Sequence, residues 1–527
     1  MKIKVAERRR EANVACGARC TNSFTTLLRS FMRTTTLGLV VVVAIHACTD
    51  GTEAQESWPR FRGPNGSGVS TTTATLPVEF GPNKNLAWRT TVDSGHSSPV
   101  IFGDRIFLTA STDNQFEVLC LNAPTGEILW RKELPQPEPE RVHKINTRAS
   151  PTAVVDATRV YVYFGTLGVV CFDHAGTEQW KRPLETPLRN LFGTASSLML
   201  LPDKLIFTCD NETDSFIEAL DPVTGDVIWH KPRKGLRSSW STPVVLENNG
   251  STELLVYGVS WLTALDPKDG SDRWSVPGLA DEPAITPAIG DGLVFVSSYN
   301  MKSNSEVIGI PPFADLLKQL DKDGNDTISF DEGAANRSVL SRNDADGEGD
   351  HPLRLFYRML DENRDKEISS SEYVKLSKWL NSFEQENGLI AIRPPEEAGQ
   401  KAEVVWRHRT GVPEVPSPLY YRGRIHLVKN GGIATCLNAT TGKQIYQQRL
   451  KSGGPYYASP IAANGQIYTA SARGLVTVME AGDTLKVLAR NKIGQRIMAT
   501  PAIVGDRIYV RTESQLMAFG LSNVGEE

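Results

Sequence analysis

Two acidic segments of the chain place oxygen-bearing side chains at the spacing that a hard divalent cation requires. The first, residues 321–332, offers oxygen at positions 1, 3, 5, 7, 9 and 12 through Asp321, Asp323, Asn325, Thr327, Ser329 and Glu332. The second, residues 361–372, repeats the pattern with Asp361, Asn363, Asp365, Glu367, Ser369 and Glu372. Calcium binds roughly six to eight oxygen atoms, and alternating side chains, one backbone carbonyl and a bidentate final glutamate supply such a set. The sequence therefore predicts two calcium sites.

The segments that flank these loops have the apolar spacing of short helices, at residues 313–320, 353–360 and 373–380. Ile328 and Ile368, each at loop position 8, are expected to pair and to hold the loops together. Both loops resemble EF-hands, in which position 6 is a glycine that makes a sharp turn. Here position 6 is Asp326 or Lys366. Because Asp tolerates a positive φ better than Lys, the first loop is expected to bind calcium more tightly, and the alternative is that both are acidic surface turns that hold no metal.

The rest of the chain carries a repeat whose period, about 45 residues, is typical of propellers. One repeating unit is an apolar strand, an Asp or Asn, a turn that ends in Gly, and an aromatic residue soon after. The instances end at Trp130, Trp180, Trp229, Trp274 and Tyr446, and Trp88 and Trp406 stand in the same slot. The blade around Gly482 lacks such an aromatic residue, and Leu488 is the nearest apolar candidate.

The other repeating unit is a Ser-Pro or Thr-Pro pair followed by an apolar strand. Seven pairs begin at Ser98, Ser150, Thr242, Thr286, Ser417, Ser459 and Thr500, and Ser197-Leu198 fills the missing place. Together the two units make four short strands, which is one blade, so the count predicts eight blades. Residues 85–92 read as a lone outer strand, and residues 500–520 as three strands without one. We expect the two ends to join in one blade and close the ring.

This pattern resembles the pyrroloquinoline-quinone-like β-propeller repeat. The resemblance covers roughly residues 85–520 apart from the insertion, and residues 58–68 resemble the leading segment of a bacterial subgroup of such propellers. The resemblance implies an all-β fold, an eight-bladed, quinoprotein-like β-propeller with a small α-helical EF-hand insertion. We expect the propeller at residues 85–300 and 388–520, the EF-hand pair at 301–387, a linker and leading segment at 49–84 and a tail at 521–527.

The first 48 residues have the composition of a secretory signal, because basic residues precede an apolar run at 37–45 that is too short to span a bilayer. A start at Met32 would give a signal of ordinary length. The run ends at Cys48 in a sequence that resembles a lipoprotein cleavage box, so a lipid anchor at Cys48 and ordinary cleavage near Ala47 or Ala54 are both open. Either route exports the protein to the periplasm or cell envelope. Cys120, Cys171 and Cys436 occupy a small-residue slot of the repeat, which favours buried packing positions over disulfides, and Cys209 has no assigned partner.

Composition limits the classes of function. A formal charge of −4 and no sustained basic stripe after residue 33 exclude a phosphate-backbone footprint, so nucleic acid is not an expected partner. The sequence predicts an exported calcium-binding propeller, a monomeric, non-enzymatic scaffold or binding protein for an unidentified protein or cell-envelope partner. The alternative is a pyrroloquinoline-quinone-dependent oxidoreductase, against which stands the lack of adjacent cysteines and of a Cys-x-x-Cys-His haem motif. No catalytic residue is assigned, and His96 and His143 are the histidines to test if activity is found.

Overall fold

The computed structural model describes residues 57–113, 115–137, 140, 142–185, 188–190, 192–235, 238–299, 312–333, 357, 360–380 and 387–521. The signal peptide predicted for residues 1–48, with Met32 and Cys48, lies outside these residues. Within the described part of the chain, every helix is too short or too polar to span a lipid bilayer.

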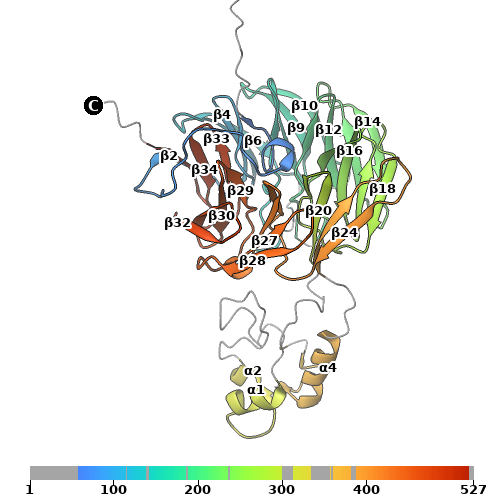
Figure 1. Ribbon diagram of the computed structural model, residues 1–527, viewed down its shortest axis with the longest axis vertical. Helices are drawn as coiled ribbons and strands as arrows, with labels where there is room; N and C mark the ends of the chain where they lie inside the picture. Colours follow the sequence, from blue (N-terminus) through green and yellow to red (C-terminus); the bar gives the residue numbers. More distant parts are fainter. Residues whose placement is uncertain are drawn as a thin grey trace, which may run out of the picture. The chain divides into compact units, whose positions relative to one another are not determined.

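Eight antiparallel sheets follow one another along the described residues and form the blades of a β-propeller (Figure 1). Blades 1 to 4 comprise β3 (Val100–Phe102), β4 (Arg105–Ser111), β5 (Gln115–Asn122) and β6 (Ile128–Pro135); β7 (Val154–Val155), β8 (Arg159–Phe164), β9 (Gly168–Asp173) and β10 (Glu178–Arg182); β11 (Met199–Leu201), β12 (Lys204–Cys209), β13 (Phe216–Leu220) and β14 (Val227–Pro232); and β15 (Val244–Asn248), β16 (Ser251–Gly258), β17 (Trp261–Leu265) and β18 (Asp272–Pro277).

Blades 5 to 7 continue the pattern, with a 3-10 turn η2 (Asn430–Gly432) in blade 6. They comprise β19 (Ala288–Gly290), β20 (Leu293–Ser298), β23 (Gly388–Arg393) and β24 (Glu403–His408); β25 (Leu419–Tyr421), β26 (Arg424–Lys429), β27 (Ile433–Asn438) and β28 (Gln444–Arg449); and β29 (Ile461–Ala463), β30 (Gln466–Ser471), β31 (Leu475–Glu480) and β32 (Lys486–Lys492). The predicted eight-bladed fold is confirmed.

Blade 8 joins the two ends of the propeller. Its strands β33 (Ala502–Val504), β34 (Arg507–Arg511) and β35 (Gln515–Phe519) come from the end of the chain, and its outer strand β2 (Leu86–Thr91) comes from the beginning. Trp88 lies opposite Ala518 in the β2–β35 register. The predicted closure is therefore correct, and it removes the long open edge that an incomplete ring would expose.

The repeated aromatic residues connect neighbouring blades. Each lies across from a small residue of the third strand, as Trp130 does from Cys120 and Trp229 from Ala219. In five blades the indole N–H also donates to a carbonyl in the turn of the following blade, at 2.9 to 3.1 Å, from Trp88, Trp130, Trp180, Trp229 and Trp406. The repeat thus encodes contacts between blades as well as within them.

Blade 7 corrects one expectation. The residue that stands across from the third strand in the aromatic slot is Ala489, which pairs with Val478, and Leu488 falls at the adjoining register shift. In the other blades the larger side chain of this pair is on the fourth strand, whereas in blade 7 Val478 of the third strand is larger than Ala489. Cys120, Cys171, Cys209 and Cys436 are buried free thiols, as the repeat register predicted for the first, second and fourth.

The insertion lies in the chain between β20 and β23, which pair with each other as neighbouring strands of blade 5. Its described elements are α1 (Phe313–Leu320), β21 (Ile328–Ser329), α2 (Phe330–Gly333), β22 (Glu367–Ile368) and α4 (Ser370–Leu380). A small apolar core of its own, with Phe313, Leu316 and Tyr373 among its members, holds these elements together. Because strands of a blade alternate in direction, the insertion leaves the propeller on the face that carries the connections between blades.

Candidate functional site

The two acidic loops lie back to back through a short antiparallel ladder. Ile328 of β21 pairs with Ile368 of β22, and Ser329 pairs with Glu367, which is the pairing predicted from loop position 8. Both isoleucines are fully buried. Thr327 Oγ1 also donates to the carboxylate of Glu367 at 2.8 Å, and this hydrogen bond joins the first loop to the second.

In the first loop the residues predicted as ligands converge. Carboxylate oxygens of Asp321, Asp323 and Glu332 all lie within 4.8 Å of one another. Glu332 closes the loop on itself, because Oε1 accepts from the Lys322 N–H at 2.8 Å and Oε2 accepts from the Ser329 N–H at 2.9 Å. Backbone N–H groups, that of Lys322 first, lower the pKa of Glu332, so this carboxylate is charged at neutral pH. Asn325, at position 5, accepts from Thr327 and lies in the same turn.

The second loop repeats this construction. Glu372 Oε2 accepts from the Ser369 N–H at 3.0 Å and Oε1 accepts from the Glu362 N–H at 3.1 Å. Burial raises the pKa of Glu372, but the N–H and hydroxyl donors, led by those of Ser369, outweigh it and leave the pKa lowered. The remaining predicted side chains form Asx-type turns from Asn363 and Asp365. Asp361 holds a buried Oδ1 atom that has no hydrogen-bond partner in the structure.

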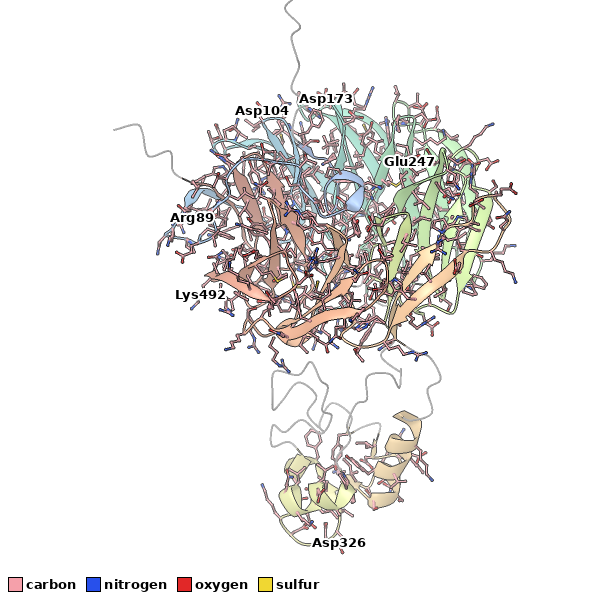
Figure 2. All side chains as sticks on the ribbon, viewed as in Figure 1. Arg89, Asp104, Asp173, Glu247, Asp326 and Lys492 are labelled. Carbon is pink, nitrogen blue, oxygen red and sulfur yellow. The ribbon has the colours of Figure 1, made fainter. Side chains whose placement is uncertain are left out.

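The two loops differ in backbone strain. At position 6 both Asp326 (φ 61°) and Lys366 (φ 70°) adopt the left-handed conformation that was expected there. Figure 2 shows Asp326 at the tip of the first loop. At position 4, however, the first loop has Gly324 (φ 75°) and the second has Arg364 (φ 63°). The second loop therefore holds two long side chains in a conformation that disfavours them, and the order of calcium affinities stays a prediction.

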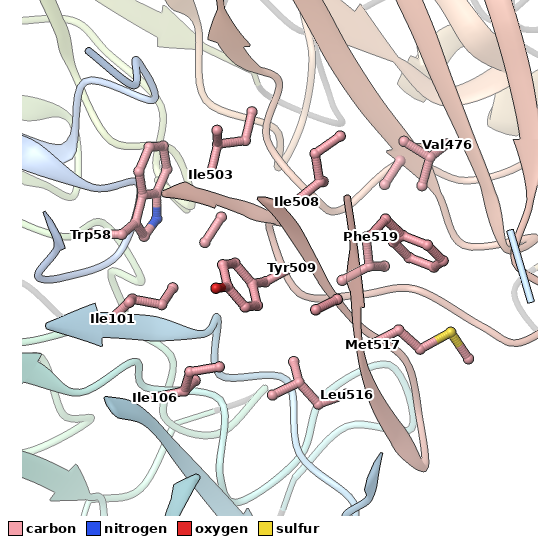
Figure 3. Packing of buried hydrophobic residues seen from close by; sticks show 14 of the residues in the cluster. Trp58, Ile101, Ile106, Val476, Ile503, Ile508, Tyr509, Leu516, Met517 and Phe519 are labelled. Atoms are coloured by element: carbon pink, nitrogen blue, oxygen red, sulfur yellow. The ribbon is translucent and has the colours of Figure 1, made fainter. Parts of the chain in front are cut away.

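A second candidate site is a cavity of about 210 Å³ on the propeller axis. One end of the axial channel is occupied by residues 57–69, called here the leader, which contain β1 (Ser57–Trp58) and the 3-10 turn η1 (Pro64–Gly66). Trp58 is fully buried, and Figure 3 shows it beside Ile101 of blade 1 and Ile503 of blade 8. The leader bonds to the first strands of several blades, and its Phe61 lines the cavity.

A chain of hydroxyl groups surrounds this cavity. In six of the eight blades the backbone N–H of the residue two positions before the first strand donates to the hydroxyl of its counterpart in the next blade, at 2.9 to 3.0 Å. The members are Ser98, Thr152, Ser197, Thr242, Thr286, Ser417, Ser459 and Thr500. In blade 2 the pair Ser150-Pro151 marks the repeat unit in the sequence, but the hydroxyl residue two positions before the strand is Thr152. Thr152 takes the structural role because β7 begins at Val154, and Ser150 instead donates to the Thr147 carbonyl.

Eight further side chains of the cavity wall come from one repeating position of the blades. In every blade the residue two places before the hydroxyl residue lines the cavity, and these are His96, Ser150, Ala195, Trp240, Ala284, Val415, Tyr457 and Met498. Ile145, Asn146, Phe192, Glu282 and Glu414 complete the wall. Sequence reasoning missed this site, although the position two before each Ser/Thr-Pro pair would have identified most of it.

The charged groups of the cavity wall are acidic. Glu282 is exposed and Glu414 is half-buried, and among the described residues that line the cavity there is no Lys or Arg. Burial, with smaller effects from Arg511 and Arg496, lowers the pKa of His96 to about 3, so this imidazole is neutral at physiological pH. His143, the other histidine singled out in the sequence, meets the ring of Phe192 edge to face, with 4.9 Å between ring centres, and does not line the cavity.

Comparison with known proteins identifies the propeller. The chain matches the family model described as outer membrane protein assembly factor BamB, over residues 65–190, 114–308 and 429–523. The chain belongs to this family. No curated protein matches it.

Among solved structures, BamB from Moraxella catarrhalis is similar in fold, at 12% identity and a TM-score of 0.51, covering 83% of this chain and 99% of that one. The computationally designed protein Ika8 matches at 10% identity and a TM-score of 0.48, covering 82% of this chain and 98% of its own. The quinohemoprotein alcohol dehydrogenase ADHIIG from Pseudomonas putida HK5 matches at 12% identity and a TM-score of 0.49, with coverages of 89% and 81%.

Some propellers of quinoprotein type hold pyrroloquinoline quinone on the axis, so the fit of that cofactor to this BamB-family cavity can be tested. The quinone is a polycarboxylate and needs cationic partners. The described wall instead presents Glu282 and Glu414, and its imidazole His96 is neutral. The described residues of the cavity wall therefore do not fit this cofactor.

Proposed function

We propose that this BamB-family propeller is an exported, calcium-binding protein of the cell envelope that acts as a non-enzymatic scaffold or binding protein. The EF-hand pair of the insertion would hold the metal, and the propeller would supply a rigid surface for its partner. The partner is a protein or another component of the envelope.

The observation that carries the calcium assignment is the convergence of Asp321, Asp323 and Glu332 in the first loop. Like charges held within a few ångströms of one another repel, and a divalent cation offsets that repulsion. The ladder between Ile328 and Ile368 joins this loop to a second of the same build, as in paired calcium loops.

The envelope assignment is supported by the family and by the sequence. The description of the matching family names an outer membrane protein assembly factor. Residues 1–48 have the pattern of a secretory signal, with Cys48 at a lipoprotein-like box. A closed ring of eight blades is also a rigid platform on which a partner can bind without a folding transition.

Calorimetric titration of the chain from residue 49 onward with calcium tests the metal assignment. We expect two binding events in the wild type, loss of the tighter one in Glu332→Gln and loss of the weaker one in Glu372→Gln. Glu362→Gln is the matched control, because Glu362 sits in the second loop but its side chain pairs with Lys375. No calcium heat in the wild type, or unchanged heats in both ligand variants, would refute the assignment.

Export is tested separately by fusing residues 1–56 to a phosphatase that is active only outside the cytoplasm. We expect activity from this fusion, and from one that begins at Met32. Metabolic labelling with a fatty acid then distinguishes the two cleavage routes, since Cys48→Ala abolishes a lipid anchor and leaves ordinary cleavage intact. An inactive fusion would contradict the envelope assignment whatever the calcium result.

A further inference from the structure

The axial cavity has the features of a ligand site rather than of a packing gap. Its aromatic residues Phe61, Phe192, Trp240 and Tyr457 are all only half-buried, although they lie at the centre of the molecule. Rings that stay exposed toward an interior cavity leave apolar surface in contact with water, which is unfavourable unless a ligand covers it. Residues from all eight blade connections contribute to the wall, so the site exists only in the closed ring.

The rings are held in fixed positions. Trp240 Nε1 donates to the Gly193 carbonyl at 2.7 Å, and the indole meets Phe192 edge to face, with 5.3 Å between ring centres and an angle of 89°. The Phe192 carbonyl in turn accepts from Asn146 Nδ2 at 2.9 Å. Such prior ordering lowers the entropic cost of binding.

Two carboxylates share the cavity wall with these rings. The backbone N–H of Trp240 donates to the Pro283 carbonyl at 2.8 Å, and Glu282, the residue before Pro283, lines the same cavity as Trp240. Glu414 and Tyr457 both line the cavity, and the pKa of Tyr457 is raised by burial first and by the negative charge of Glu414 second. Arg496 is also near Tyr457 but does not line the cavity. Aromatic faces combined with carboxylates attract organic cations through cation–π and ionic interactions.

The size and shape of the cavity limit the ligand. At about 210 Å³ it is smaller than the pockets that hold drug-sized molecules, which span roughly 300–1,000 Å³. The leader occupies one end of the channel, so a ligand enters from the face that carries the blade connections. A short molecule with one cationic group matches these dimensions.

We propose that the axial cavity binds a small organic cation, an ammonium or guanidinium group on a short apolar body, between Trp240 and Tyr457 and with Glu282 and Glu414 as counter-charges. This site is separate from the calcium loops and does not depend on the function proposed above.

Calorimetry with choline and methylguanidinium as probes tests the proposal on the chain from residue 49 onward, with and without calcium. The neutral isostere of choline, 3,3-dimethylbutan-1-ol, measures the contribution of charge, and benzoate represents an anion of similar size. We expect at least one cation to bind, with the isostere at least about tenfold weaker than choline if choline is the ligand, and no heat from benzoate.

Two variants locate the binding. Trp240→Leu and Glu414→Gln should each weaken cation binding several-fold, and the weakening in Glu414→Gln should decrease at high salt. Trp261→Leu and Glu247→Gln are matched controls, since Trp261 is an exposed residue of β17 and Glu247 lies outside this cavity. Circular dichroism and thermal unfolding confirm that each variant is folded.

Three results would overturn the proposal: no binding of either cation, equal binding of choline and its neutral isostere, or unchanged cation affinity in folded Trp240→Leu. None of these bears on the calcium titration, so failure here is distinct from failure of the proposed function.

Discussion

Substitution of Gly442 by alanine measures how tightly neighbouring blades are packed. Gly442 follows the turn of blade 6 at φ +68°, and a Cβ atom there would lie 2.5 Å from Cδ2 and 2.7 Å from Cε3 of Trp406, the aromatic residue of blade 5. The left-handed conformation costs an alanine about 1–2 kcal/mol, and forcing a methyl group against the half-buried Trp406 ring costs about 1–3 kcal/mol more. We therefore expect Gly442→Ala to reduce the free energy of unfolding by about 2–5 kcal/mol.

Gly423 provides the control for the backbone part of this cost. It has nearly the same conformation, at φ +72°, but a Cβ atom there has no neighbour within 4 Å. Gly423→Ala should therefore cost only about 1–2 kcal/mol. Urea unfolding of both variants, followed by circular dichroism, gives the difference between them, which isolates the contact with Trp406.

A double-mutant cycle tests the cause. In a Trp406→Leu background the ring is absent, so Gly442→Ala should then cost no more than Gly423→Ala. Equal destabilisation by the two glycine variants in the wild-type background would refute the reasoning, and so would a Gly442→Ala cost that persists without the indole.

Three further predictions follow from single contacts. Lys366→Gly should relieve the left-handed strain of the second loop and raise its calcium affinity by about 1 kcal/mol, roughly fivefold, in calorimetry. Burial, with a smaller effect from Arg424, lowers the pKa of His426 to about 4, and neither ring nitrogen has a hydrogen-bond partner. Because the unfolded chain takes up this proton near pH 6.5, stability should fall as the pH drops from about 6.5 to 4, and His426→Leu should flatten that part of the urea-unfolding profile. Thr500→Val removes the acceptor of the buried Ser459 N–H and should cost about 1–3 kcal/mol, measured by the same assay, with faster hydrogen exchange at that amide.

Much of the fold was predictable because the repeat is a local signal. The aromatic residue, the turn glycine and the hydroxyl residue recur from blade to blade, and in seven blades the aromatic residue pairs with a small residue of the third strand, as Trp130 does with Cys120. Even the closure by β2 followed from a lone strand at one end and a missing one at the other. The number of blades and the closure of the ring depend only on the order of the strands, which the repeat pattern in the sequence predicts.

The repeat pattern is less informative where the hydrogen-bond register decides which residue occupies a given position of the blade. Ala489 rather than Leu488 fills the blade 7 slot because a register shift falls after the pair with Val478. Thr152 rather than Ser150 belongs to the hydroxyl ring because β7 begins at Val154, two residues after Thr152. Counting residues along the sequence does not show where a β-bulge shifts the register, so it cannot identify the paired residue.

The two candidate sites, the acidic loops and the axial cavity, differ in how far the sequence alone predicts them. The residues predicted to bind calcium in one loop lie within twelve consecutive positions, so their spacing alone predicts the site. Trp240 and Tyr457, by contrast, are far apart in sequence and share a cavity only because the ring is closed. Their common place in the repeat becomes informative once the fold is known.

The leader occupies one end of the axial channel, which leaves the cavity open at the other end. Arg60 and Arg62 are buried and donate to the carbonyls of Pro243 in blade 4 and Pro418 in blade 6, at 2.6 and 2.7 Å. Burial lowers their pKa values to about 10 and about 9, so both remain charged at neutral pH. One terminal nitrogen of each guanidinium thus donates to a carbonyl rather than to a carboxylate, which is an unusual environment for a buried arginine. Since Phe61 lies between them in the chain and lines the cavity, the two anchors fix the floor of the proposed cation site.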